Sequence, residues 1–208
     1  MRAAGDFTRD VALIDAGGAN LGSVRFALER IGVSPRIARD ADDIGGAQRV
    51  ILPGVGAAAP AMALLRERGL DHALRALDVP LLGICLGMQL LFESSDEGEV
   101  DCLALLPGRV RRLEPAKGVR VPHMGWNALE NVHAQSPLLA GIDDGAEAYF
   151  VHSYALPVTE DCIAACTHGQ SFAAVVQRGR ICGAQFHPER SASVGARLLA
   201  NFLAGAYL

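Results

Sequence analysis

The stretch VPLLGICLGMQLLFE, residues 79–93, decides the fold because it places a strand directly before a helix. Its first part, residues 79–84, is uniformly apolar, as a parallel strand is when helices cover both faces of its sheet. Glycines flank Cys85 in the pattern G-x-C-x-G, which is typical of a nucleophile elbow with sulfur in place of oxygen. Glycine is needed there because a Cβ would collide with neighbouring backbone. The stretch therefore predicts a strand, a strained turn that carries a thiol, and a helix that continues to Glu93.

The same order of strand, turn and helix occurs twice upstream. The expected elements are residues 11–15, 17–20 and 21–31 in the first unit, and residues 49–52, 53–56 and 57–68 in the second. Strands that alternate with helices predict an α/β fold: a mixed, mostly parallel open sheet with helices on both faces, as in flavodoxin-like proteins.

Short strand-like runs separated by turn residues follow Gly108, which favours a smaller antiparallel section. The expected strands are residues 109–113, 126–130, 147–152, 162–167, 172–177 and 181–186. A closing helix over residues 192–203 has apolar positions at helical spacing and is expected to cover the sheet. Because the sequence contains no repeat, low-complexity tract or linker, residues 1–208 are interpreted as one domain.

Composition and charge exclude several functional classes. Half of the 208 residues are apolar, which is enough for one core without disulfides. A net charge of -4 gives no field that recruits nucleic acid or anionic lipid. The apolar run at residues 79–92 is shorter than the roughly 18 residues that a membrane span requires. Five cysteines without a CxxC pair, and a first segment without a hydrophobic secretory signal, predict a cytoplasmic protein.

A histidine and a carboxylate near the C-terminus complement Cys85. In the segment FHPE, His187 and Glu189 stand at i and i+2 of extended backbone and project to the same side. A histidine that accepts the thiol proton, oriented by a carboxylate, would complete a Cys-His-Glu triad. The plainer alternative for Cys85 is a small buried cysteine between packing glycines.

An enzyme of this kind also needs donors for a negatively charged tetrahedral oxygen. The glycine-rich turn at residues 53–56 follows the neighbouring strand, so the backbone N–H groups of Val55 and Leu86 are the expected oxyanion donors. An ordinary strand-to-helix turn is the alternative for residues 53–56.

Three segments together resemble, in order and spacing, the triad or class I glutamine amidotransferases. They are PGVG at residues 53–56, GICLGMQLLFE at 83–93 and GAQFHPERS at 183–191. Within that family, the chain most resembles the glutaminase subunits of imidazole glycerol phosphate synthase. Three further segments carry this narrower resemblance: the loop at residues 15–23, PHMGWN at 122–127 and YFVHSY at 149–154.

The resemblance implies a reaction and a partner. L-Glutamine would be hydrolysed to glutamate and ammonia through a γ-glutamyl thioester on Cys85, with His187 protonating the departing ammonia and with no cofactor. The ammonia would pass to the (β/α)8 cyclase subunit of a heterodimer. That subunit forms imidazole glycerol phosphate and aminoimidazole carboxamide ribotide in L-histidine biosynthesis.

Positions within the matching segments carry further roles implied by the resemblance. Residues expected to hold glutamine are Gly54, Gln89, Glu97, Ser153 and Tyr154. Residues expected to contact the cyclase are Asn20, Ser23, Met124, Trp126, Tyr149 and Arg190. The alternatives are a plain helix position for Gln89 and a core position for Trp126. The early loop departs from the family pattern D-Y-G-x-G-N at Ala16 and Ala19, so its conformation is expected to differ.

The other histidines and cysteines have structural interpretations. His72, His133 and His168 are expected to be structural or solvated, while His123 and His152 are candidates for auxiliary roles. Because the remaining cysteines lack metal-ligand spacing, no zinc is expected; they are Cys102, Cys162, Cys166 and Cys182.

Two other functions remain open. A glutaminase that serves another acceptor, or a stand-alone cysteine hydrolase of γ-glutamyl compounds, would differ in partner specificity. A flavodoxin-like binding module would hold a phosphate on residues 17–20 at a helix N-terminus. The sequence offers that module no G-x-G-x-x-G pattern and a single lysine, Lys117.

Overall fold

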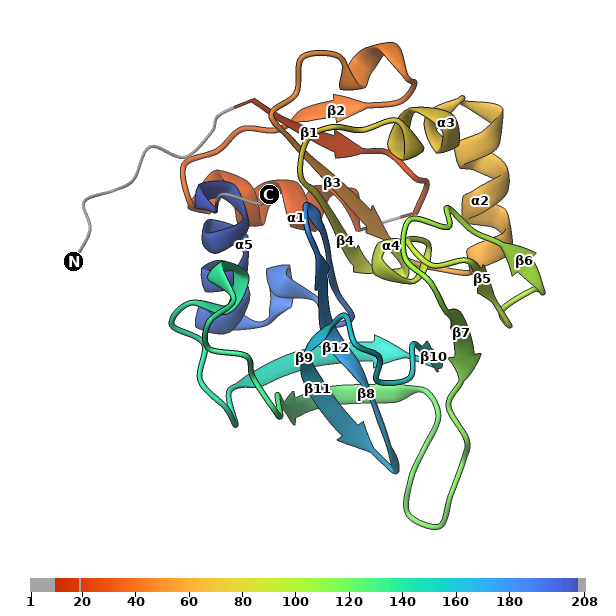
Figure 1. Cartoon of the computed structure of the whole chain (residues 1–208), viewed down its shortest axis with the longest axis vertical. Helices are drawn as coiled ribbons and strands as arrows, with labels where there is room; N and C mark the ends of the chain where they lie inside the picture. The colour runs from red at the N-terminus through yellow and green to blue at the C-terminus, as the bar shows by residue number, and fades with distance from the viewer. Residues whose placement is uncertain (1–9, 19, 206–208) are drawn as a thin grey trace.

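A seven-stranded sheet forms the centre of the molecule in the computed structural model, which describes residues 10–18 and 20–205 (Figure 1). In order across the sheet the strands are β11 (Cys162–His168), β12 (Gln170–Arg178), β13 (Ile181–Ala184), β4 (Leu81–Cys85), β3 (Arg49–Gly54), β1 (Val11–Ile14) and β2 (Arg36–Ala38). β13, β4, β3, β1 and β2 pair in parallel. β12 and β11 are antiparallel to their neighbours.

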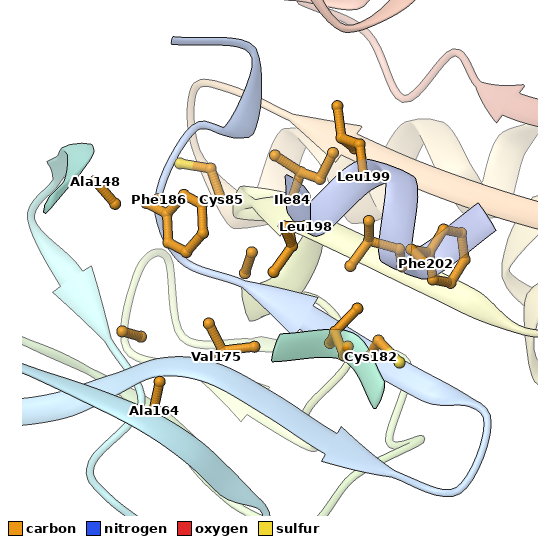
Figure 2. Packing of buried hydrophobic residues seen from close by; sticks show 14 of the residues in the cluster. Ile84, Cys85, Ala148, Ala164, Val175, Cys182, Phe186, Leu198, Leu199 and Phe202 are labelled. Carbon is orange, nitrogen blue, oxygen red and sulfur yellow. The ribbon is translucent and has the colours of Figure 1, made fainter. Parts of the chain in front are cut away.

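Helices cover both faces of this sheet because side chains alternate along its strands. α1 (Leu21–Arg30) and α5 (Ala192–Ala204) share one apolar cluster with Leu82 and Ile84. α2 (Ala58–Glu67), α3 (Leu70–Arg75) and α4 (Leu86–Gln89) share the other cluster with Leu81. Figure 2 shows Ile84 of β4 beside Leu198 and Leu199 of α5, in the first cluster. The expected α/β fold, mostly parallel with helices on both faces, is confirmed.

Two smaller sheets complete the structure. One has the order β10 (Tyr154–Ala155), β7 (Arg109–Arg112), β5 (Ser94–Ser95) and β6 (Val100–Asp101). The other is an antiparallel pair of β8 (His123–Ala128) and β9 (Glu147–His152). The 3-10 turns are η1 (Asp42–Ile44), η2 (Pro137–Leu139) and η3 (Pro188–Arg190). Within the described ranges, no helix has the length and apolarity that a membrane crossing requires.

Two expected boundaries are wrong because long-range hydrogen bonds fix them. The helix expected to continue to Glu93 ends at Gln89. The carbonyls of Leu90, Leu91 and Phe92 accept backbone hydrogen bonds from residues 103–106 instead of from the next helical turn. The strand expected at residues 181–186 ends at Ala184 and is parallel to β4, although it follows the antiparallel section.

Other differences concern short elements. The strand expected at residues 126–130 is β8, which begins at His123 and ends at Ala128. β2 and α3 were not expected, since three residues and six residues are too few for a clear periodic pattern. The expectations for Ala19 and for the segment before Asp10 concern residues outside the described ranges.

Three glycines let β3, β4 and α4 approach one another at the carboxyl edge of the sheet. A Cβ on Gly83 would lie 2.6 Å from the carbonyl oxygen of Gly87. A Cβ on Gly87 would lie 1.8 Å from the carbonyl oxygen of Leu52, and one on Gly54 would lie 2.9 Å from the nitrogen of Gly87. These contacts are with backbone, which has little freedom to move. Glycine at these positions is therefore a steric requirement, as expected from G-x-C-x-G.

Replacing Gly87 with alanine tests this close approach. We expect Gly87→Ala to lower the free energy of unfolding by about 3 kcal/mol, because the new methyl group overlaps the Leu52 carbonyl. Urea unfolding followed by circular dichroism measures the change. Gly22→Ala is the matched control, since the space around Gly22 in α1 is open within 4 Å. The control is expected to raise stability by up to about 1 kcal/mol. Equal midpoints for Gly87→Ala and the unchanged protein would contradict the steric argument.

Candidate active site

Cys85 occupies a strained turn at the end of β4. Its φ of 53° and ψ of -112° lie where L residues rarely go, and α4 begins at the next residue. Such strain costs on the order of 1–3 kcal/mol and persists only where the surrounding structure enforces it. The glycine contacts described above enforce it here. The thiol is 6% exposed and faces a cavity between the sheet edge and β9.

His187 and Glu189 stand together beside this thiol. Glu189 Oε1 lies 2.8 Å from His187 Nδ1 and accepts a second hydrogen bond, of 2.9 Å, from Asn20 Nδ2. The His187 and Glu189 side chains are only 7% and 1% exposed. Burial opposes charge on His187, but its hydrogen bonds with Cys85 and Glu189 prevail and raise its pKa to about 10. Burial also opposes charge on Glu189, yet the hydrogen bond and charge of His187 keep the pKa of that carboxyl below its usual value.

The backbone of His187 is fixed by β9. Its N–H donates to the Tyr149 carbonyl at 2.9 Å. The Ser191 hydroxyl donates to the His187 carbonyl at 2.7 Å and accepts from the Tyr149 N–H at 2.9 Å. Ser191 is fully buried, and the sequence motifs did not indicate its role. The only feature of the sequence that could have indicated this role is the position of Ser191, two residues after Glu189.

A cavity of about 260 Å³ opens over Cys85. Most of the residues expected at the site line it: Val55, Cys85, Leu86, Gln89, Glu97, Ser153, Tyr154 and His187. Gly56, Pro122, Val151 and His152 complete its wall. Gly54 pairs with Cys85 in the register of β3 and β4, so it lies beside the elbow rather than on the cavity wall. Gln89 is 4% exposed and faces this cavity, which argues against a plain helix position.

Glu97 connects the cavity to the helix that follows the glycine-rich turn. Its Oε2 accepts the backbone N–H of Ala58, the first residue of α2, at 2.9 Å. Burial raises the pKa of this carboxyl, although the hydrogen bond from Ala58 opposes the shift. The early loop packs on the same turn, because a Cβ on Gly18 would lie 2.8 Å from Val55 Cγ2.

Residues expected to contact a partner form an exposed group beside the site. Met124 and Trp126 on β8 are 64% and 51% exposed, so the core alternative for Trp126 is wrong. The Trp126 ring meets Tyr149 edge-on at 5.9 Å, and the Arg190 guanidinium lies over the Tyr149 ring at 4.4 Å. The side-chain amide of Asn20 donates to Glu189, so it points toward the triad. Ser23 is exposed on α1.

A chain of three histidines begins with His152 on the cavity wall. His152 Nδ1 is 2.9 Å from the Tyr154 carbonyl, which can only accept, so this nitrogen carries the proton. His152 Nε2 then accepts from His123 Nδ1 at 3.1 Å. His168, expected to be structural, stacks on His123 at 4.1 Å and donates from Nε2 to the Arg120 carbonyl. Burial, aided by His168, lowers the pKa of His123 to about 4. Burial dominates likewise at His152, with a pKa of about 3.

The other cysteines are buried and their thiols have raised pKa values, so they are not reactive. All four are buried. Burial is the largest cause that raises their pKa, to about 11 for Cys102 and about 12 for Cys166 and Cys182. In the part of the chain that the structure describes, His, Cys, Asp and Glu side chains form no group of three that could hold a metal ion.

Comparison with known proteins agrees with this geometry. The model of the family "Glutamine amidotransferase class-I" matches residues 12–206. The chain is 69% identical over 194 residues to the imidazole glycerol phosphate synthase subunit HisH of Xanthomonas euvesicatoria pv. vesicatoria (strain 85-10), covering 93% of this chain and 96% of the relative. The chain belongs to the HisH branch of the class-I glutamine amidotransferases. The HisH subunit of Xylella fastidiosa (strain 9a5c) is 67% identical over the same shares of both chains.

Solved amidotransferase structures share the fold of this HisH-type chain. A structure described as a glutamine amidotransferase superposes with a TM-score of 0.73 at 22% identity, covering 93% of this chain and 97% of the other. A chain in the structure of PurLQS from Thermotoga maritima gives 0.69 at 20% identity, covering 94% and 98%. At these identities the likeness concerns the fold alone.

The histidine chain predicts a loss of stability in mild acid. His123 and His152 stay neutral when folded but protonate near pH 6.5 when unfolded, so the unfolded protein binds more protons below that pH. The contribution of these two histidines to stability is therefore complete above pH 6.5 and falls as the pH drops toward 4, by up to about 1.4 kcal/mol per pH unit for each histidine. His187, with its raised pKa, contributes a constant stabilisation below pH 6.5.

Urea unfolding between pH 6.5 and 5 measures this slope. His123→Gln should reduce it by about one proton, because one of the two low-pKa histidines is removed. His72→Gln is the control, since the His72 side chain is 86% exposed and should leave the slope unchanged. A slope that is the same in His123→Gln and in the unchanged protein would show that His123 is not held neutral.

Proposed function

We propose that this chain is the glutaminase subunit of an imidazole glycerol phosphate synthase, with residues 1–208 forming one amidotransferase domain. It hydrolyses L-glutamine to glutamate and ammonia, and a cyclase subunit consumes the ammonia in L-histidine biosynthesis. One observation carries the proposal: the buried His187–Glu189 pair, 2.8 Å apart, hydrogen-bonds the thiol of a strained elbow at one cavity. The membership in the HisH branch supplies the pathway.

The geometry supports a two-step reaction at Cys85. The thiolate attacks the amide carbon of glutamine, forming a C–S bond and a negative oxygen that the N–H groups of Val55 and Leu86 stabilise. The intermediate collapses as the C–N bond breaks, and His187 gives its proton to the leaving nitrogen, which departs as ammonia. Water then attacks the thioester while His187 takes a proton from it. Glutamate leaves, and the thiolate and protonated His187 are restored.

The electrostatics of the site fit these roles. A His187 pKa of about 10 keeps the imidazole protonated at neutral pH, so it pairs with the thiolate and holds the proton that ammonia needs. Glu189 fixes the ring through Nδ1, which leaves Nε2 to face the sulfur. Asn20 fixes Glu189 in turn. We therefore assign Asn20 to the orientation of the triad as well as to the nearby partner surface.

Glutamine would lie along the cavity wall. The Glu97 carboxylate is the group suited to the α-ammonium, and Ser153 and Tyr154 also line the cavity. Gly54 acts on the substrate indirectly, because its backbone pairs with Cys85 in the sheet and so positions the elbow. No step in this mechanism uses a cofactor. The five cysteines are free thiols in the structure, which fits a protein of the reducing cytoplasm.

The exposed group around Trp126 is the proposed docking surface for the cyclase, a (β/α)8 barrel in a heterodimer. Exposed aromatic and methionine side chains next to an arginine are typical of binding hot spots. Met124, Trp126, Tyr149 and Arg190 supply that combination beside the cavity, and Ser23 on α1 extends it. Neither nucleic acid nor a membrane is an expected partner.

Removing the thiol tests the chemistry. Cys85→Ala should abolish glutamine-dependent synthesis by the reconstituted pair, because no other group can form the thioester. Added ammonium should still support the cyclase reaction at the rate seen with the unchanged glutaminase. Glutamate release and cyclase product are measured in parallel. Glutaminase activity retained by Cys85→Ala would overturn the mechanism.

Glutamate release with and without the partner tests the coupling. The isolated chain should hydrolyse glutamine slowly, with a large rise when the cyclase and its ribulosyl ligand are added. Trp126→Ala should weaken cyclase binding about 30-fold, the effect of losing roughly 2 kcal/mol at a hot spot. Val158→Ala, at another exposed apolar position, should bind as before. Equal turnover with and without cyclase would favour a stand-alone hydrolase or a different acceptor.

A further inference from the structure

Two buried glutamines connect the cavity wall to the Cys85 sulfur. Gln89 Nε2 donates to the Tyr154 carbonyl at 2.7 Å and to Gln185 Oε1 at 3.0 Å. Gln185 Nε2 in turn donates to Cys85 Sγ at 3.8 Å. Gln185 follows β13, next to β4 in the sheet, and is 0% exposed. None of the roles assigned above uses Gln185.

The direction of these hydrogen bonds follows from one backbone group. A carbonyl can only accept, so the Tyr154 oxygen requires the NH₂ end of Gln89. That NH₂ also meets Gln185, which must therefore turn its oxygen toward Gln89. The NH₂ of Gln185 is then left facing sulfur. The reverse orientation would set two donors against each other, and burying an unpaired polar group is costly.

The sulfur has different partners in its two protonation states. As a thiol, Cys85 donates to the Val151 carbonyl at 3.8 Å. As a thiolate it has no proton to donate, and the carbonyl then faces a negative charge. Gln185 offers an N–H to that charge from the side of the sheet, while His187 offers one from the segment after β13. Hydrogen bonds to charged groups are about twice as strong as those between neutral groups.

We infer that Gln185 is a positioning residue that donates Nε2–H to the Cys85 thiolate and holds the sulfur in its attacking orientation. The inference rests on the proposed function, in which that thiolate attacks glutamine. The other titratable groups at the cavity are His187, His152 from β9, Tyr154 and Glu97. Gln185 differs from these groups because its amide does not titrate, so it can donate to the thiolate at any pH.

The same geometry restricts what Gln89 can do for a substrate. Tyr154 and Gln185 take both N–H groups of Gln89, so only its oxygen is left for a ligand in the cavity. Gln89 is therefore suited to accept from an ammonium or an amide NH₂, and unsuited to donate to a carboxylate.

Alkylation of Cys85 by iodoacetamide tests the inference without glutamine or a partner. Rate constants are measured from pH 5.5 to 9, with Cys85→Ala as the blank for the four other, buried cysteines. Gln185→Leu should move the half-maximal rate upward by about one pH unit, which corresponds to about a tenfold slower reaction at pH values below both midpoints. Gln185→Glu should move it further, because a carboxylate replaces the donor next to sulfur.

Gln177→Leu is the matched control. Gln177 lies on the neighbouring strand β12, opposite Cys182, and its amide contacts Ser136 and Gly179 rather than the cavity. Its alkylation profile should coincide with that of the unchanged protein. Urea midpoints separate a loss of folding from a shift in the profile.

A measurement on the unchanged protein covers the case in which the Gln185 variants do not fold. The Gln185 side-chain amide signals in a ¹⁵N-labelled sample should titrate with the midpoint found by alkylation, whereas those of Gln177 should not. The inference would be overturned if folded Gln185 variants had the alkylation profile of the unchanged protein. It would also be overturned if the chemical shifts of the Gln185 amide did not change with pH around the alkylation midpoint. The proposed function would still stand in that case, since it depends on glutamate release being lost in Cys85→Ala.

Discussion

The close approach of β3, β4 and α4 is the constraint on which the rest of the site depends. Backbone contacts at Gly54, Gly83 and Gly87 leave no space for a methyl group, and they force the chain into a sharp turn between them. That turn gives Cys85 its positive φ and directs the thiol out of the sheet edge. Apolar packing on both faces of β4 supplies the stability that offsets the strain.

Two histidines near this turn differ in protonation: His187 is protonated and His152 is neutral. His187 contacts a thiol and a carboxylate, and these partners outweigh its burial. His152 also lines the cavity but meets a carbonyl and another imidazole, so its burial prevails and it stays neutral. Of the two histidines that line the cavity, one is therefore protonated and the other is neutral. In the proposed mechanism, only the protonated one can supply a proton to the leaving nitrogen.

The sequence predicted the parts of the site that are encoded locally. The elbow, the His187–Glu189 pair and most of the cavity wall lie within short motifs whose spacing carries their geometry. The contacts of Asn20 with Glu189 and of Gln185 with Cys85 join residues 169 and 100 positions apart, so no local pattern reveals them. The early end of α4 has the same origin, because residues 103–106 donate to the carbonyls of the three residues at 90–92 that follow the helix. Tertiary hydrogen bonds, rather than propensity, decided each of these features.

Tyr149 holds His187 through main-chain atoms alone, while its ring points to Trp126 and Arg190 at the surface. A substitution at position 149 that keeps the strand would leave the imidazole in place, whatever side chain it introduced. The surface beside the cavity is thus free to diverge as a neighbouring protein changes, without altering the reacting groups beneath it. The proposed docking surface and the proposed catalytic histidine are thus both connected to Tyr149, the first through its ring and the second through its backbone.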